Sequence, residues 1–220
     1  SLTRDNDTYA WTAHVNVDRP YTVNGLNQYT AAGGVTFGYD GRGNLTQSGG
    51  STYAYNSDNL LATGPGGVTV YYDPNGRMIR IADPTGEVQF YYAGAMRIAD
   101  NGGNGAMLRR FVPGPAGVSG GAADDPALWY EGPTAQYRRW LHADERGSIV
   151  AVSEASEGAA LAINRYDEYG IPQAGNLGRF GYTGQIWVPE LGMWYYKARF
   201  YSPTLGRFMQ VDPIGYEDQI

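Results

Sequence analysis

Apolar and more polar residues alternate along several short stretches of this chain, which is the pattern of β-strands with one buried face. The stretch 68–72 reads VTVYY and the stretch 88–92 reads VQFYY. Glycine and proline clusters separate these stretches, and such clusters mark turns. The pattern therefore predicts short strands joined by tight turns.

A short motif recurs along the chain: a tyrosine, then an aspartate or asparagine, then a glycine-rich pair and a leucine or methionine. It reads YDGRGNLT from Tyr39, YNSDNLLAT from Tyr55 and YDPNGRMIRI from Tyr72, and it returns as DERGSIV from Asp144 and YDEYGI from Tyr166. Asp or Asn with Gly forms the turn, and the flanking apolar residues lie on strands, so each copy predicts a β-hairpin. Such a hairpin cannot bury its face alone, so successive hairpins must stack into one extended sheet.

Composition supports an all-β fold. The 220 residues include 32 Gly and 19 Tyr against 6 Phe, and 17% of them are charged. Glycine is costly inside a helix, whereas tyrosine packs well on a half-buried pleated surface. The absence of cysteine excludes disulfides and thiolate metal sites. A net charge of −6 and a pI near 4.9 argue against nucleic acid or an anionic membrane surface as the main partner.

The chain divides into three predicted parts. Residues 1–101 carry the repeated hairpins, and residues 102–136 are rich in Gly, Pro and Ala, which predicts a loop excursion or linker. Strand-like stretches resume in 137–220. No stretch approaches the 18 apolar residues that would predict membrane insertion.

The motifs of the third part resemble those of a known family. The segments are WLHADERGSIVAV from Trp140, NRYDEYGIP from Asn164, and GRFGYTGQIWVPELGMWYYKARFYSPTLGRFMQVDPIG from Gly178. Together with the hairpin repeats, they resemble the RHS or YD-repeat proteins. Residues 137–220 are similar to the core-associated domain of that family, so we interpret the chain as part of a longer one.

The resemblance implies a fold and a function. The fold is a curved sheet of stacked YD-repeat hairpins, part of a hollow shell or barrel, which the core-associated segment closes. The function is encapsulation of a C-terminal toxin or effector segment in cis, within a bacterial protein that is secreted or displayed at the cell surface. Immunity or delivery proteins are further implied partners, and no cofactor is implied.

The same resemblance implies a candidate for self-cleavage, because many relatives look like aspartyl-type autoproteases. By motif position, Asp212 of DPIG matches a catalytic carboxylate and Arg199 of ARFY matches an arginine near the cleavage site. Aspartyl chemistry needs two carboxylates, yet this chain has Phe200 and Ser202 where relatives carry aspartates. The second carboxylate is then expected from a downstream DPxG motif. In the simpler interpretation Asp212 only forms a turn and Arg199 pairs with a carboxylate.

Other chemistry has weaker support. The aromatic clusters Trp194-Tyr195-Tyr196, Tyr71-Tyr72 and Tyr91-Tyr92 could stack on carbohydrate, which makes an adhesin the alternative function, although alternating aromatics in strands are more often cross-strand packing pairs. No metal-binding loop or nucleophilic triad is evident around the two histidines. Three arginines among aromatics are expected to be buried and to need carboxylate or carbonyl partners: Arg179, Arg199 and Arg207, with Asp167, Glu168, Glu190 and Asp212 as the candidate carboxylates.

Overall fold

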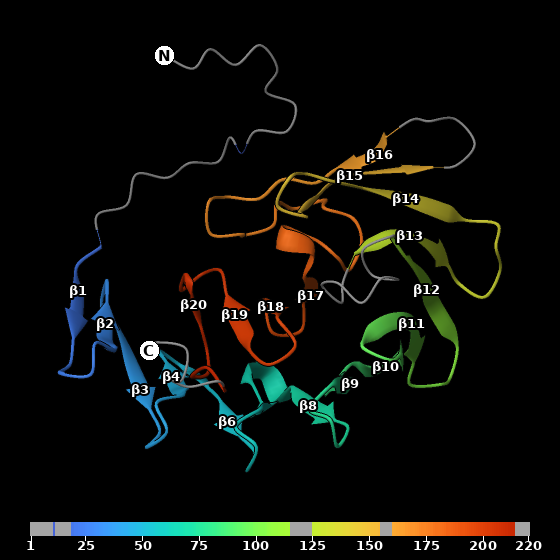
Figure 1. Ribbon diagram of the computed structural model, residues 1–220. Coiled ribbons are helices and arrows are strands. Elements are labelled where there is room, and N and C mark those ends of the chain that lie inside the picture. The colour runs from blue at the N-terminus through green and yellow to red at the C-terminus, as the bar shows by residue number, and fades with distance from the viewer. Residues whose placement is uncertain (1–10, 12–18, 115–124, 155–159, 214–220) are drawn as a thin grey trace, which may run out of the picture. The chain divides into compact units, whose positions relative to one another are not determined.

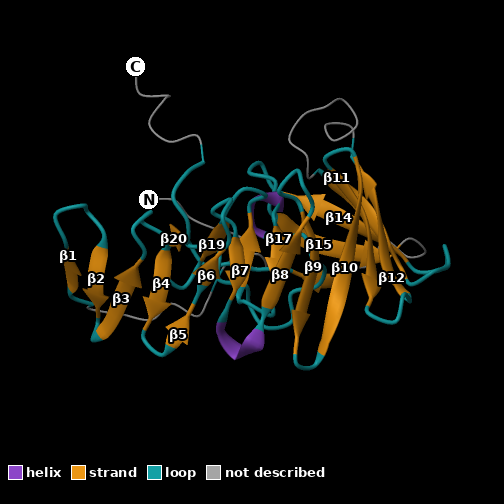
Figure 2. Ribbon diagram, turned by 90° about the horizontal axis from the view of Figure 1, so that it is seen from below, coloured by secondary structure: helices purple, strands orange, loops and turns teal. Residues whose placement is uncertain are grey.

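A computed structural model describes residue 11 and residues 19–114, 125–154 and 160–213. Within these ranges the regular secondary structure is almost entirely antiparallel strand, and helix is confined to two short 3₁₀ turns, η1 (Pro65–Gly67) and η2 (Tyr182–Gly184) (Figures 1 and 2). The all-β prediction is confirmed. The chain forms two compact units that interleave in sequence: unit 1 comprises residues 1–14 and 86–188, and unit 2 comprises residues 15–85 and 189–220.

In unit 2 the strands up to β9 follow one another as hairpins. The first five form a sheet in chain order, and the next four pair successively: β1 (Tyr21–Val23), β2 (Tyr29–Ala32), β3 (Val35–Tyr39), β4 (Leu45–Ser48), β5 (Ser51–Thr52), β6 (Ala54–Tyr55), β7 (Leu61–Thr63), β8 (Thr69–Tyr72) and β9 (Met78–Asp83). A second group of antiparallel strands completes this unit: β18 (Met193–Tyr195), β19 (Phe200–Ser202) and β20 (Arg207–Phe208).

In unit 1 seven strands pair antiparallel in chain order, and one further short strand follows them: β10 (Gly86–Ala93), β11 (Met96–Gly102), β12 (Met107–Pro113), β13 (Pro126–Glu131), β14 (Arg138–Ala143), β15 (Ile149–Glu154), β16 (Ala160–Ile163) and β17 (Ile186–Val188). The predicted loop excursion 102–136 is wrong in part, because it contains β12 and β13. Phe111 lies opposite Trp129 in their ladder, and both rings are buried. β12 and β13 form because they pair with each other, although the composition around them predicts a loop. The three-part division of the chain otherwise stays a prediction.

One turn geometry recurs at six places in the described residues. In each copy the side-chain oxygen of the first residue accepts hydrogen bonds from the backbone N–H groups two and four positions later, at 2.7–3.0 Å. The residue three positions later has positive φ, which favours Gly or Asn. The six first residues are Asn24, Asp40, Asn56, Asp73, Asp144 and Asp167. Five belong to the motif seen in sequence, and the copy at Asn24 was missed.

Two of the tyrosines that directly precede these turns in unit 2 have a structural role of their own. The Tyr55 hydroxyl donates to the Leu45 carbonyl at 2.7 Å, and the Tyr72 hydroxyl donates to the Leu61 carbonyl at 2.7 Å. Leu45 and Leu61 occupy the same position of successive repeats and are fully buried. Each tyrosine therefore fastens its own hairpin to the buried leucine of the preceding one. We call this series of bonds in unit 2 the tyrosine ladder.

The ladder surrounds an apolar core in unit 2. Its fully buried side chains include Leu45, Leu61, Met78 and Ile81 from the hairpins and Trp194, Phe200 and Met209 from the C-terminal strands. Burial on this scale stabilises the unit by roughly 1.5–3 kcal/mol for each large side chain. The C-terminal strands are thus part of the core of unit 2.

Candidate functional site

The C-terminal strands of unit 2 are hydrogen-bonded directly into the tyrosine ladder. The Met78 N–H donates to the Tyr195 hydroxyl at 3.0 Å. The Met209 carbonyl accepts from the Leu45 N–H at 2.9 Å and from the Tyr55 hydroxyl at 3.2 Å. Tyr195 thereby supplies a hydroxyl to the third repeat, and Met209 is held by the first two. These contacts fix the segment that leads to Asp212.

The two predicted site residues meet. Arg199 Nη2 lies 2.7 Å from Asp212 Oδ2, and the guanidinium is stacked 3.9 Å above the centre of the Phe208 ring. The Arg199 side chain is 24% exposed and that of Asp212 is 40% exposed. An ion pair so open to solvent contributes little to stability, typically about 0.2–1 kcal/mol. The ion pair orients both side chains. Because the simpler interpretation, in which Arg199 only pairs with a carboxylate, expects the same contact, a catalytic role for Asp212 stays a prediction.

A buried asparagine links the first repeat to the residue before Asp212. Asn44 donates through Nδ2 to Asp40 Oδ2 at 2.8 Å and also to Asn59 Oδ1. Its Oδ1 accepts from the Val211 N–H at 3.4 Å. Burial raises the pKa of Asp40, but the hydrogen bonds from the Asn44 side chain and from backbone amides outweigh it and lower the pKa overall. The Asp40 turn therefore favours an ionised carboxylate.

An open groove of about 650 Å³ runs beside the Arg199–Asp212 ion pair. Its described charged lining residues are Arg42, Arg199, Arg207 and Asp212, so the net charge along it is positive. Asp212 is the one carboxylate among them, whereas aspartyl catalysis needs two carboxylates sharing a proton. The described lining of the groove therefore supplies one of the two carboxylates that such catalysis would need.

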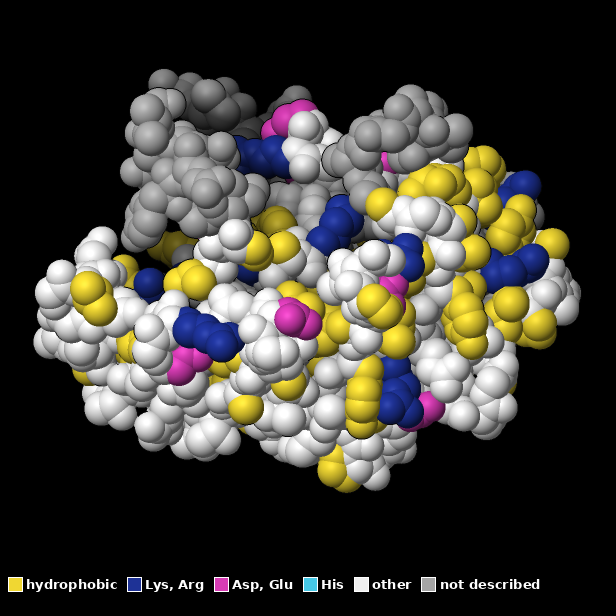
Figure 3. Space-filling view, turned by 60° about the horizontal axis from the view of Figure 1, so that its bottom comes forward, with side chains coloured by type: hydrophobic (Ala, Val, Ile, Leu, Met, Phe, Trp, Pro, Cys, Tyr) yellow, Lys and Arg dark blue, Asp and Glu magenta, His cyan; other side chains and the backbone are white. Residues whose placement is uncertain are grey.

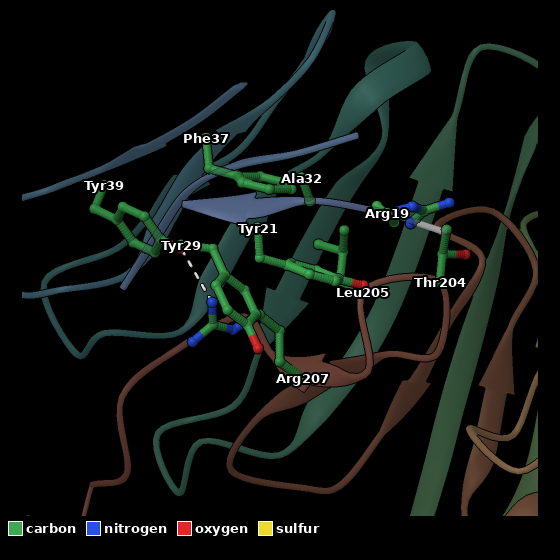
Figure 4. A pocket seen from close by; sticks show the side chains of 9 residues that line it. All are labelled: Arg19, Tyr21, Tyr29, Ala32, Phe37, Tyr39, Thr204, Leu205 and Arg207. Carbon is green, nitrogen blue, oxygen red and sulfur yellow. Dashed lines mark hydrogen bonds between the residues drawn. The ribbon is translucent and has the colours of Figure 1, made fainter. Parts of the chain in front are cut away.

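An aromatic socket adjoins the groove and shares Tyr39 and Arg207 with it (Figure 4). Arg207 Nη1 donates to the Tyr39 hydroxyl at 3.2 Å, and the guanidinium lies 4.6 Å from the centre of the Tyr29 ring. Burial raises the pKa of Tyr39, although the charge of Arg207 opposes it. The cavity in the socket is only about 20 Å³, which is room for one water molecule. The contacts of Arg207 with Tyr39 and Tyr29 anchor β20 on the sheet formed by β1–β5.

The three arginines expected to be buried are only partly so, and their described partners include a carboxylate, a tyrosine hydroxyl and a backbone carbonyl. Arg199 does pair with Asp212. Arg207 uses a tyrosine hydroxyl instead of a carboxylate, and Arg179 lies 4.0 Å from Asp100. Among the suggested acids, Asp167 accepts the backbone amides of its own turn, and Glu168 and Glu190 have contacts of their own.

The fully buried ion pair lies elsewhere, in unit 1, between Arg97 and Asp100. Arg97 Nε donates to Asp100 Oδ1 at 2.7 Å, and the guanidinium lies 3.8 Å from the centre of the Phe90 ring. Both side chains are inaccessible to solvent. An arginine and an aspartate three residues apart on a strand gave no sequence signal, because only the bulge in the β10–β11 ladder, between Arg97 and Ala99, brings them to one face.

The described residues also bear on carbohydrate stacking, metal binding and membrane-spanning helices. Trp194 and Tyr195 are buried in the core of unit 2, so these two rings of the cluster offer no surface to carbohydrate. No group of three or more potential metal ligands occurs in the part of the chain that the structure describes. The described residues also include no helix that is long and apolar enough to cross a membrane.

The fold defines a class: all-β proteins of successive antiparallel hairpins with a recurrent turn, which in unit 2 pack around the strands β18–β20. No protein-family profile matches the chain. In sequence it is 27% identical over 206 residues to the tRNA3(Ser)-specific nuclease WapA of Bacillus spizizenii, covering 87% of this chain and 8% of that protein. The tRNA nuclease WapA of Bacillus subtilis shows the same identity and coverage. The Escherichia coli protein YibJ is 34% identical over 84 residues, covering 34% of each chain.

Solved toxin-complex structures share the fold. The TcdB2-TccC3 structure without its hypervariable C-terminal region superimposes with a TM-score of 0.57 at 18% identity, over 91% of this chain and 12% of that one. The Photorhabdus luminescens Tc holotoxin pore gives a TM-score of 0.59 at 17% identity with the same coverage. These findings relate the chain to RHS-type toxin proteins. The chain spans only about a tenth of their length.

Proposed function

We propose that this chain is the closing part of a YD-repeat, RHS-type shell that encloses or presents a C-terminal effector segment of the same polypeptide. The observation that carries the proposal is the tyrosine ladder of unit 2, into which the segment 189–213 is hydrogen-bonded. A repeated turn with one tyrosine bond per hairpin builds a wall by addition of like units. A wall of this kind works by exclusion and needs no cofactor.

The relatives favour a toxin setting for this wall. The WapA proteins are named as tRNA nucleases. The TcdB2-TccC3 structure is of a protein from which a hypervariable C-terminal region is missing. By analogy, the effector segment here would follow the closing segment in sequence. We place the protein outside the producing bacterial cell, with delivery and immunity proteins as further partners.

Protease protection tests the enclosure. The natural polypeptide that contains this chain would be digested with thermolysin, and the effector segment would be followed by intact mass. We expect the effector segment to survive in the folded protein and to be degraded quickly in the Phe200→Ala variant, whose wall is weakened. Equal digestion of the effector segment in both proteins would show that it lies outside any shell.

A second candidate function is cis-acting aspartyl autoproteolysis. It is favoured by the position of Asp212, which faces a positively charged groove and is oriented by Arg199. In this proposal Asp212 accepts a proton from the attacking water, and a second carboxylate from downstream sequence completes the pair. Arg199 then acts as a positioning residue.

Intact mass of the natural polypeptide and its Asp212→Asn variant tests this proposal. The matched control is Asp58→Asn, an exposed turn residue outside the groove. Cleavage in the wild type and in Asp58→Asn, but not in Asp212→Asn, would support the autoprotease. A full-length product from all three proteins, with unchanged circular dichroism, would leave the passive wall as the function.

A further inference from the structure

The turn that begins at Asn24 differs chemically from the other copies, because its first residue is an asparagine followed directly by a glycine, Gly25. In an Asn–Gly dipeptide the backbone nitrogen of the glycine can attack the asparagine side chain with little steric hindrance, because glycine has no Cβ. The chain contains four such dipeptides, which begin at Asn24, Asn75, Asn101 and Asn104. Their hydrogen bonds separate Asn24 from the other three.

Among these four dipeptides, all of them in described residues, Gly25 alone has an unbonded nitrogen. After Asn75, Asn101 and Asn104, the N–H of the following glycine donates to a backbone carbonyl at 2.8–2.9 Å. The Gly25 N–H forms no hydrogen bond with any residue that the structure describes. Gly25 is also exposed, and Figure 3 shows mainly backbone and uncharged polar side chains at its left-hand end, where Figure 1 draws β1 and β2. Solvent base can therefore reach this nitrogen.

The side-chain carbonyl of Asn24 is polarised for attack by the turn itself. Its Oδ1 accepts hydrogen bonds from the Leu26 N–H at 2.9 Å and from the Gln28 N–H at 3.0 Å. Its Nδ2 donates to Gln28 Oε1 at 2.8 Å, which fixes the orientation of the amide. Backbone donors on a carbonyl oxygen stabilise the negative charge that develops there when a nucleophile adds. The turn therefore supplies an oxyanion hole for its own first residue.

We propose that Asn24 is a site of intramolecular deamidation. The Gly25 nitrogen gives up its proton to solvent base and forms a bond to Asn24 Cγ. The Cγ–Nδ2 bond breaks, and the amide nitrogen takes up a proton from water and leaves as ammonia. Water then opens the resulting succinimide ring at either carbonyl, which gives aspartate or isoaspartate. The proposal concerns unit 2 and is independent of the enclosure and of any cleavage at Asp212.

The two products differ in their effect on the turn. Aspartate would keep it, because the side chains of Asp40, Asp73, Asp144 and Asp167 accept the equivalent pair of backbone amides in their own turns. Isoaspartate carries the main chain through its side-chain carbon, and this extra atom displaces the acceptor oxygen from the amides. β1 is the outermost strand of its sheet in the described residues. Isoaspartate at this position would therefore open the β1–β2 hairpin at the edge of the sheet.

Peptide mapping by mass spectrometry, after incubation of the full chain at mildly alkaline pH, tests the proposal. In the folded protein Asn24 should be converted at least about fivefold faster than Asn75, Asn101 or Asn104, which corresponds to the roughly 1 kcal/mol of one backbone hydrogen bond. In urea, where the turns are lost, the four asparagines should be converted at similar rates. Labelling with an isoaspartyl methyltransferase should detect isoaspartate at position 24 of the aged folded protein.

Asn56 shows within the same protein what the turn does without the glycine. Its Oδ1 accepts the N–H groups of Asp58 and Leu60 at 3.0 and 2.9 Å, as in the turn at Asn24, but the next residue is Ser57. Asn56 therefore has the oxyanion hole and lacks the unhindered nitrogen. It should be converted more slowly than Asn24 in the folded protein.

Gly25→Ala removes the unhindered nitrogen and leaves the fold intact. A Cβ at Gly25 would meet no atom within 4 Å, and the residue does not have positive φ. The variant should slow the conversion of Asn24 at least about tenfold, because the new methyl group hinders the attacking nitrogen. The matched control is Gly41→Ala, at the same position of the turn that begins at Asp40 and equally open. It should leave the conversion of Asn24 unchanged.

Four results would overturn the proposal. In the folded protein these are conversion of Asn24 no faster than at the other three dipeptides, conversion of Asn56 as fast as that of Asn24, and an undiminished rate in Gly25→Ala. The fourth is an unchanged order of rates in urea, which would show that the turn has no part in the selection. Thermal unfolding of each variant shows that the compared proteins are equally folded.

Discussion

Replacing Tyr72 by Phe removes one bond of the tyrosine ladder and leaves its packing intact. The hydroxyl of Tyr72 donates at 2.7 Å to the carbonyl of Leu61, and Leu61 is fully buried. Without this donor the carbonyl loses a partner in a place that water reaches poorly. Such a loss costs about 1–2 kcal/mol, and 1 kcal/mol shifts the Tm of a chain of this size by about 2–4 °C. We therefore expect the Tm to fall by about 2–8 °C.

The matched control is the same substitution at the neighbouring position, Tyr71→Phe. Tyr71 is 38% exposed and its ring stacks under Arg80, so the loss of its hydroxyl should change the Tm by less than about 1 °C. Both variants would be unfolded thermally and in urea, with near-ultraviolet circular dichroism as the signal. If Tyr72→Phe were as stable as Tyr71→Phe, the tyrosine hydroxyls would not fasten the hairpins to one another.

Three further predictions concern pH and the core. Burial raises the pKa of Tyr72 above 10, so its neutral form stabilises the fold below pH 10 and this contribution is lost as the pH rises further. Tyr72→Phe should therefore reduce the alkaline fall in the free energy of unfolding, measured with urea, by up to about 1.4 kcal/mol per pH unit. The pKa of Asp40 is lowered despite its burial, so its contribution is present above the unfolded pKa of about 3.9 and lost as the pH falls; Asp40→Asn should show a shallower loss of stability between pH 5 and pH 2 by the same assay. Phe200→Ala should cost about 3–5 kcal/mol in urea unfolding, because Phe200 is fully buried, and a cost below 1 kcal/mol would contradict its place in the core.

The turns could be predicted from the sequence because their chemistry is local. The side-chain oxygen of an Asp or Asn accepts the backbone amides two and four positions later, and a Gly or Asn three positions later supplies the positive φ, so a window of five residues contains the whole requirement. The copy at Asn24 was missed because it has no preceding tyrosine and Asn27 stands where Gly is usual. The role of the tyrosine hydroxyl was also missed, because its acceptor lies in the preceding repeat.

Features that depend on long-range pairing could not be predicted in the same way. The strands β12 and β13 flank a Gly- and Pro-rich stretch, and only their ladder brings Phe111 opposite Trp129. The partners of the arginines depend on which strands become neighbours. Motif order placed Arg199 near Asp212, yet nothing in the sequence distinguished Arg97, which is fully buried, from Arg110, which is not.

The way the closing segment is held in unit 2 bears on how an effector could leave. Met209 accepts two hydrogen bonds from the first two repeats, and Trp194 and Phe200 fill the core that those repeats share. Withdrawing the segment 189–213 would expose these side chains, so its release would amount to unfolding unit 2. A shell built in this way retains its closing segment, because the cost of undocking is the stability of the whole unit. An effector that follows the segment would therefore be freed by cleavage beyond Pro213 or by opening of the wall elsewhere, and not by undocking of the closing segment itself.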